Sequence, residues 1–161
     1  MMAGGSAQRP QTFVELWVDG FFRSDPDFLA KALVEEWSGF DSIPHGDFAE
    51  ILFALRQLEV DLRAAPSDED RAFFDALPDP VTIYRGQDAS AAPGLSWTTD
   101  REVATKLAGP MRSRHLRNPV ILEAKITKAD IAFVCNDRQK AELVLWAAPR
   151  VKRRLPLPSV G

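Results

Sequence analysis

Three short segments in the second half of the chain hold residue types that could bind an anion or act on a substrate. The first is Tyr84-Arg85-Gly86, at the end of a predicted strand. A guanidinium binds phosphate oxygens as a two-pronged fork, and a glycine beside it lets a ligand approach the backbone. This segment predicts an anion clamp. A surface arginine before a turn glycine is the alternative.

The second segment is Gly94-Leu95-Ser96-Trp97-Thr98-Thr99. Side chains alternate between the two faces of a strand, so Ser96 and Thr98 are expected on one face and Trp97 on the other. Two hydroxyls pointing together can orient a neighbouring polar group. The alternative is an ordinary edge strand with a buried tryptophan.

The third segment begins at Glu142 and continues into the apolar run Leu143-Val144-Leu145. A carboxylate is costly to bury unless a partner pairs with it. At the head of such a strand, Glu142 is expected to be hydrogen-bonded, paired with a cation or reactive. A glutamate at a strand edge that faces solvent is the competing interpretation.

The elements that must position these residues change type near the middle of the chain. Apolar residues recur with helical spacing in the first half and predict four helices, over 12–22, 24–39, 47–62 and 67–77. Pro78 and Pro80 interrupt this pattern. The following residues favour strands over 81–84, 120–126, 131–134, 142–147 and 151–155, with a helix capped by Thr99 and Glu102 between the first two.

This order predicts an α+β fold in which a helical N-terminal layer packs on a mainly antiparallel β unit. We expect a disordered segment over 1–10 and a single domain over 11–161, helical over 11–78 and β-rich over 81–155. The net charge of −3 hides a strong asymmetry, because residues 1–80 carry 6 Lys or Arg against 16 Asp or Glu, whereas residues 81–161 carry 14 against 7. An anionic ligand is therefore expected on the C-terminal half.

Composition limits the other classes of site. Cys135 is the only cysteine, which excludes an intramolecular disulfide, and with two histidines in the chain we expect no metal site. No apolar run approaches the length that spans a bilayer, and the first residues lack the features of a secretory signal. The sequence predicts a cytoplasmic protein, or one delivered into a target cytosol, without membrane partners.

Taken in order, the three segments resemble the arginine-serine-glutamate class of mono-ADP-ribosyltransferases. The resemblance spans roughly residues 81–147 and rests on Tyr84-Arg85-Gly86, on Leu95-Ser96-Trp97-Thr98 with the capped helix that follows, and on Glu142 with its strand. It implies the split-sheet core of that family, NAD⁺ as the co-substrate and transfer of ADP-ribose to a macromolecule with release of nicotinamide. A bacterial or phage toxin or effector is one setting that it implies, with an inhibitor or antitoxin protein as a further partner.

The resemblance also assigns roles to individual residues. By similarity, Arg85 braces the dinucleotide and the backbone of Gly86 holds the nicotinamide carboxamide. Ser96 and Thr98 position the glutamate, and Glu142 grips the ribose hydroxyl. A negative group beside the ribose suits this chemistry, because breaking the N-glycosidic bond develops positive charge there.

Two features depart from the family pattern. Lys140 stands two residues before Glu142, where many relatives have Glu or Gln that activates the acceptor. A cation cannot deprotonate an arginine side chain, so an arginine acceptor is disfavoured. Arg85 and Ser96 are also close in sequence, which implies a compact version with fewer inserted loops.

Two basic stretches bear on the acceptor. One contains Arg112 and Arg114, and the other is Arg150-Val151-Lys152-Arg153-Arg154. Together with Lys140, these cations could contact the phosphates of a nucleic-acid acceptor. Alternatively they bind the phosphates of NAD⁺, solvate a loop or protect an edge strand. A protein acceptor is favoured over a nucleic acid, because basic clusters of this length have many ordinary explanations.

Two further functions remain open at this point. One is an NAD⁺ glycohydrolase of the same fold, with water as the acceptor. The other is a non-catalytic binding module whose basic face holds nucleic acid or a protein partner. Turnover of NAD⁺ distinguishes the enzymes from the binding module.

Overall fold

The computed structural model describes residues 32–34, 37, 45–59, 62, 67–109, 116–136 and 141–157. The helix predicted over 12–22 and the disordered segment predicted over 1–10 lie outside these ranges. Of the helix predicted over 24–39, residues 32–34 and 37 are described, and they are helical. The elements with continuous bounds are α3 (His45–Gln57), α4 (Asp68–Ala76), β1 (Val81–Asp88), β2 (Ser96–Thr98), α5 (Arg101–Ala108), β3 (Pro119–Ile126), the 3-10 turn η2 (Lys128–Asp130), β4 (Ile131–Cys135), β5 (Glu142–Leu145) and β6 (Val151–Pro156).

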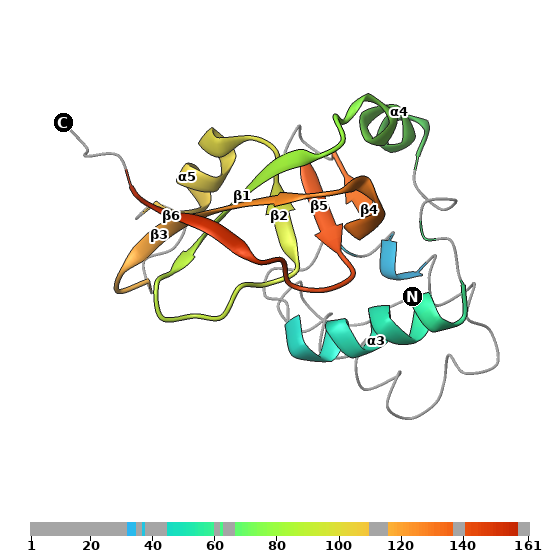
Figure 1. The fold of residues 1–161 in the computed structure, drawn as a ribbon, viewed down its shortest axis with the longest axis horizontal. Coiled ribbons are helices and arrows are strands. Elements are labelled where there is room, and N and C mark those ends of the chain that lie inside the picture. The colour runs from blue at the N-terminus through green and yellow to red at the C-terminus, as the bar shows by residue number, and fades with distance from the viewer. Residues whose placement is uncertain are drawn as a thin grey trace.

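The described strands form one antiparallel sheet of six in the order β4-β5-β2-β1-β3-β6 (Figure 1). This confirms the predicted α+β class with an antiparallel β unit. The predicted strands are all present. Strand β1 is longer than predicted, because it continues past Tyr84 to Asp88 and pairs with β3 along its whole length. Pairing in the sheet thus holds the segment 85–88, whose residue types do not favour a strand by themselves.

The helix boundaries follow local hydrogen bonds. Helix α4 begins at the predicted cap, where Ser67 Oγ accepts from the backbone N–H of Asp70 at 3.2 Å. Helix α5 is capped by Asp100 and not, as predicted, by Thr99, because the Asp100 carboxylate accepts from Glu102 N at 2.9 Å. An aspartate directly after a threonine offers two competing caps, and the structure uses the carboxylate.

Helix α3 starts two residues before the predicted Asp47 and ends at Gln57, short of the predicted Leu62. The end coincides with Glu59, whose φ of 57° is left-handed. A left-handed residue after the last turn terminates a helix, and glycine is its usual signal. The sequence has no glycine here, so the apolar periodicity alone overestimated the length.

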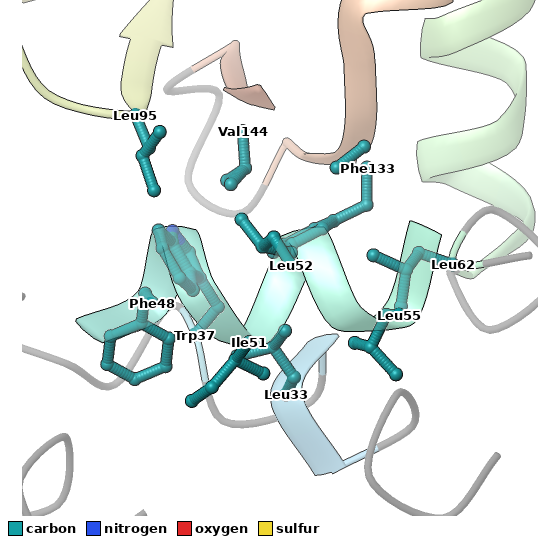
Figure 2. Close-up of a cluster of buried hydrophobic side chains, with 11 residues drawn as sticks. Leu33, Trp37, Phe48, Ile51, Leu52, Leu55, Leu62, Leu95, Phe133 and Val144 are labelled. Atoms are coloured by element: carbon teal, nitrogen blue, oxygen red, sulfur yellow. The ribbon is translucent and has the colours of Figure 1, made fainter. Parts of the chain in front are cut away.

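Two apolar clusters hold the helices on the sheet. In one, α3 side chains such as Ile51, Leu52 and Leu55 meet Leu95, Phe133 and Val144 from the strands and the loop before β2 (Figure 2). In the other, Trp97, Ile83 and neighbouring strand residues lie under Phe73, Phe74 and Leu77 of the α4 segment. The sheet is therefore covered by α3 on one face and by α4 on the other.

Helices α3 and α5 lie over the same face of this twisted sheet. Residues that are directly opposite each other on neighbouring strands share a face, so Tyr84, Thr98 and Glu142 face the same side. Residues two apart in one strand also share a face, which adds Gly86 and Val144 to this row. Helix α5 packs at the β1 end of this row and α3 packs at the β5 end. The predicted site residues of β2 and β5 are positioned between the two helices.

Candidate functional site

Glu142 occupies the centre of a group of polar side chains. Its half-buried carboxylate accepts a hydrogen bond from Ser96 Oγ through Oε2. The same oxygen accepts from the indole Nε1 of Trp37 at 3.2 Å. Two donors on one oxygen restrict the rotation of the carboxylate and fix the direction in which it points. Glu142 is thus not a solvent-facing glutamate at the strand edge.

The contact between Ser96 and Glu142 follows from strand register. In the β2–β5 ladder, Thr98 is opposite Glu142 and Ser96 is opposite Val144. Ser96 and Glu142 are therefore diagonal neighbours on one face, within reach of a hydroxyl and a long carboxylate. The predicted alternation along β2 is confirmed, because Ser96 and Thr98 share this face while Trp97 is buried in the opposite cluster.

Trp37 is a site residue that the sequence did not reveal. The indole is buried and is held edge-to-face against Phe48 and Phe133, with ring centroids 5.5 and 5.4 Å apart. Its N–H then points at Glu142, which lies 105 positions away in the sequence. The helical spacing of Trp37 with its apolar neighbours predicts a core position and nothing more. The only available signal is that a buried indole N–H requires an acceptor.

Arg85 joins the same group through the backbone of β2. Its Nη1 donates to the carbonyl oxygen of Ser96 at 2.7 Å, and its Nε donates to Gln87 Oε1 at 2.8 Å. Ser96 and Val144 form a non-hydrogen-bonded pair, so the Ser96 carbonyl points away from β5 and towards β1. The guanidinium fills the position next to this carbonyl and links β1 to β2.

Burial lowers the pKa of Arg85 from its ordinary value, whereas the negative charge of Glu142 raises it. Ser96 brings the two charges near each other, because its carbonyl accepts from Arg85 and its hydroxyl donates to Glu142. Arginine stays protonated in proteins, so the guanidinium remains a fixed cation beside the carboxylate at neutral pH. The three segments predicted from the sequence therefore meet, with Arg85, Ser96 and Glu142 in one group.

Gln87 is a second residue that we did not anticipate. Its side chain is buried, accepts from Arg85 and donates through Nε2 to the carbonyl of Ala91 at 2.8 Å. It thus connects the guanidinium to the loop between β1 and β2. A glutamine that both accepts and donates in this way orients the arginine fork.

Gly86 has a structural role that the sequence did not reveal. An added Cβ would lie 2.3 Å from the carbonyl oxygen of Ala104 and 2.6 Å from Ala108 Cβ, both in α5. The missing side chain therefore admits the helix on this face of β1. We expected the glycine to admit a ligand, and the structure gives the space of its side chain to α5.

Thr98 serves the start of α5. Its Oγ1 accepts from the backbone N–H of Asp100 at 3.0 Å, just before the helix begins. The two hydroxyls of β2 thus have different bonds, Ser96 to the carboxylate and Thr98 to the turn. Thr98 still lies directly opposite Glu142 in the sheet and is buried.

The backbone immediately before Glu142 is in an unusual conformation. Ala141 has a φ of 50°, in the left-handed region that costs a residue with a side chain roughly 1–2 kcal/mol. Two bonds hold it there: Ala141 N donates to Asn136 Oδ1, and Ala141 O accepts from Thr99 N, each at 3.2 Å. Backbone strain next to a polar centre is typical of functional sites.

A second carboxylate extends the polar row along the sheet. Glu123 on β3 is opposite Tyr84 and is buried, and Arg153 of β6 donates to both of its oxygens, through Nη2 at 2.8 and 2.9 Å. In the sequence, Arg153 is one member of a basic stretch. The structure uses this arginine to neutralise a buried glutamate.

Three other predicted contacts, Lys140, Arg112 and Arg114, lie outside the described residues. Within the described ranges, no group of three or more His, Cys, Asp or Glu side chains is arranged to hold a metal ion. The helices of the same ranges are also too short or too polar to cross a membrane.

No protein-family model, curated protein or solved structure matches this chain. The function must therefore be argued from the site itself.

Proposed function

We propose that this protein is a mono-ADP-ribosyltransferase that transfers ADP-ribose from NAD⁺ to a macromolecule in the cytosol and releases nicotinamide. The observation that carries the proposal is the group formed by Glu142, Ser96 and Arg85. It combines a fixed carboxylate, the hydroxyl that orients it and a cation close to both. These are the chemical groups that cleavage of a glycosidic bond to a cationic leaving group requires.

In the proposed reaction, the bond between ribose C1′ and the nicotinamide nitrogen breaks, and its electron pair leaves with nicotinamide. The acceptor forms a new bond to C1′ and loses a proton. Positive charge develops on the ribose in the transition state, and the Glu142 carboxylate stabilises this charge and holds a ribose hydroxyl. Ser96 and Trp37 keep the carboxylate in the required orientation, because both donate to its Oε2.

Arg85 supplies the positive charge that the diphosphate of NAD⁺ needs. Two of its donors hold the Ser96 carbonyl and the Gln87 side chain, so the guanidinium is anchored before any ligand arrives. Such preorganisation reduces the entropy that is lost on binding. In this proposal Thr98 supports the strand opposite Glu142, whereas Gly86 serves to admit α5 beside β1.

The direct test is Glu142→Gln. The amide oxygen can still accept from Ser96 and Trp37, so the fold should remain, whereas the negative charge is lost. We expect nicotinamide release from NAD⁺ to fall at least about 100-fold, since removing one group that stabilises transition-state charge typically costs this much. Glu69→Gln, at an exposed position of α4, is the matched control and should leave the rate unchanged. Equal rates in the Glu142 variant and the wild type would refute the proposal.

Hydrolysis of NAD⁺ is the second candidate, and Lys140 favours it because a cation is a poor base for activating an acceptor. The two reactions differ in their dependence on a macromolecule. Nicotinamide release should be stimulated by cell lysate if transfer occurs, and label from biotinylated NAD⁺ should appear on protein or nucleic acid. Release that is equal with and without lysate, and without labelled product, identifies a glycohydrolase.

A non-catalytic module predicts neither reaction. It would bind a partner without turning over NAD⁺, and its binding of nucleic acid would weaken steeply with salt. Mass spectrometry of lysate proteins and nucleic acids after exposure to the protein and NAD⁺ identifies the acceptor if transfer occurs. Release of nicotinamide distinguishes a glycohydrolase from the non-catalytic module. An inhibitor protein that blocks labelling would support a toxin or effector setting.

A further inference from the structure

A hollow of about 220 Å³ lies beyond the end of β5 that is remote from Glu142. Its charged and aromatic lining residues among those described are Arg56, Lys125, Asp130, Trp146 and Arg150. Leu145 also lines it and lies three residues from Glu142, which corresponds to about 10 Å along a strand. The hollow has room for roughly seven water molecules, and so for a phosphate group or part of a nucleotide.

Positive charge dominates this hollow. Arg56, Lys125 and Arg150 are exposed cations, and Asp130 is the one carboxylate among the described lining residues. The Asp130 carboxylate is engaged in its own turn, because its Oδ2 accepts from the N–H and the hydroxyl of Thr127 at 2.9 and 3.0 Å. An anion therefore meets an excess of positive charge.

The wall of the hollow includes an aromatic ring that is fixed in place. Trp146 is half-buried against the α3 cluster, and its backbone N–H donates to the carbonyl of Asp130 at 3.1 Å. The guanidinium carbon of Arg56 lies 5.7 Å from the centroid of its ring. The guanidinium thus lies over the indole, and aromatic rings and guanidinium planes are both surfaces on which a nucleobase stacks.

We propose that this hollow binds a nucleotide unit, with its phosphate at Lys125 and Arg150 and its base on Trp146 and Arg56. Cations bind the phosphate and an aromatic wall stacks the base, which is the combination that recognises single-stranded nucleic acid without sequence preference. The unit can come from a single strand or from a free nucleotide, and the experiment separates these sources. The proposal goes beyond the transferase activity, because no step of it uses Glu142.

The test measures the fluorescence anisotropy of a short labelled RNA over a series of salt concentrations, with AMP as competitor. For single strands, each phosphate contact contributes about 0.7 to the slope of log affinity against log salt. Because both cations contact the same phosphate in this proposal, the double variant Lys125→Gln/Arg150→Gln should reduce the magnitude of this slope by about 0.7, and each single variant by part of that amount. Lys106→Gln, which removes an exposed cation of α5 outside the hollow, is the matched control and should leave it unchanged.

Trp146→Leu tests the aromatic wall separately. It retains an apolar side chain against the α3 cluster and removes the stacking surface, so RNA affinity should fall at least about fivefold while the salt slope stays the same. Displacement of the RNA by AMP at concentrations that saturate the site identifies a free nucleotide as a sufficient ligand. If AMP does not displace bound RNA, the ligand is a single strand of nucleic acid and not a free nucleotide.

Two results would overturn the proposal. In one, the Lys125 and Arg150 variants change RNA binding no more than Lys106→Gln does. In the other, they weaken NAD⁺ binding in parallel with RNA binding, which would make the hollow part of the NAD⁺ site. Glu142→Gln should bind RNA like the wild type, so loss of NAD⁺ cleavage and loss of RNA binding remain distinguishable.

Discussion

At the scale of single residues, the main finding is that a core tryptophan also contacts the candidate catalytic carboxylate. Trp37 and Ser96 donate to the same oxygen of Glu142 from different parts of the chain. The helical half therefore contributes to the site as well as to the core. Because the indole does not touch the reacting atoms in the proposed reaction, we assign it as a positioning residue.

Trp37→Phe removes the N–H while retaining an aromatic ring between Phe48 and Phe133. A hydrogen bond to a charged group is worth about 1.5–3 kcal/mol, so we expect kcat for NAD⁺ cleavage to fall roughly ten- to hundredfold with little change in KM. The protein should lose about 1–3 kcal/mol of stability, because ring volume and a buried hydrogen bond are removed. Steady-state kinetics and urea unfolding measure both effects.

Trp97→Phe provides the matched control for this prediction. Trp97 is also buried, and its Nε1 also donates a hydrogen bond, to the carbonyl of Gly94 at 2.9 Å, but it packs in the α4 cluster away from Glu142. The Trp97→Phe variant should lose about as much stability as Trp37→Phe, but its kcat for NAD⁺ cleavage should equal that of the wild type under conditions where the variant is folded. Equal losses of kcat in the two variants would assign Trp37 a purely structural role.

At the scale of elements, β1 organises the molecule, since it pairs with β2 and β3, carries Arg85 and contacts α5. Gly86→Ala tests the contact with the helix. Its Cβ would overlap the backbone of Ala104, which cannot rotate away, so we expect a loss of about 1–3 kcal/mol or more as α5 shifts. Thermal unfolding followed by circular dichroism measures this loss.

Gly109→Ala is the matched control, because the nearest atom to its added Cβ is the Lys106 carbonyl oxygen at 3.3 Å. A small displacement relieves this contact, and the stability should change by less than about 1 kcal/mol. If Gly86→Ala is as stable as Gly109→Ala, α5 does not pack against β1 as closely as described.

We expect Asp88, at the end of β1, to make folding sensitive to acid. Asp88 accepts from both the N–H and the hydroxyl of Ser90 through Oδ1 and from the N–H of Asn118 through Oδ2, and these bonds hold its pKa well below the ordinary value. A carboxyl with a lowered folded pKa contributes stability above its unfolded pKa of about 4. This contribution is lost as the pH falls through the lowered folded value.

Asp88→Asn should therefore be less stable than the wild type at pH 7, and the difference should narrow below about pH 4. Urea unfolding at a series of pH values measures the difference. Asp75→Asn, on α4, is a control that removes an exposed carboxylate elsewhere. A difference for Asp88→Asn that is constant from pH 7 to pH 3 would contradict the role of its ionised side chain.

At the scale of the whole molecule, local patterns predict the elements well, whereas contacts between distant segments are not encoded in any local pattern. Alternation along β2 placed Ser96 and Thr98 on one face, and the cost of burying a charge indicated that Glu142 needed a partner. Both arguments use only neighbouring residues and the physics of one strand. They identified Ser96 and Glu142, two of the residues that meet, but neither the bond between them nor their roles in a reaction.

The missed residues share a different property. Trp37 and Glu142 are 105 positions apart, and Glu123 and Arg153 are 30 apart, so each contact depends on packing or register that no single segment encodes. The helix end at Glu59 was missed for a local reason, because the left-handed residue is not a glycine. The resemblance to the transferases supplied roles for the site residues, and these roles remain predictions.

The helical portion supplies Trp37 to the site, and the β-rich portion supplies Glu142. We therefore expect the two portions to unfold as one unit, and Leu52→Ala tests this. Leu52 is fully buried between α3 and the strands, and its truncation should cost about 2–5 kcal/mol. The neighbouring Phe53 is 64% exposed, so Phe53→Ala should change the stability by about 0.5 kcal/mol or less. If the two portions form one cooperative unit, urea should abolish the helical circular dichroism signal and NAD⁺ cleavage at the same midpoint. Leu52→Ala should lower both midpoints equally, because unfolding of α3 also removes the Trp37 side chain that orients Glu142. Cleavage that persists after the helical signal is lost would show two independent units and leave Trp37 dispensable.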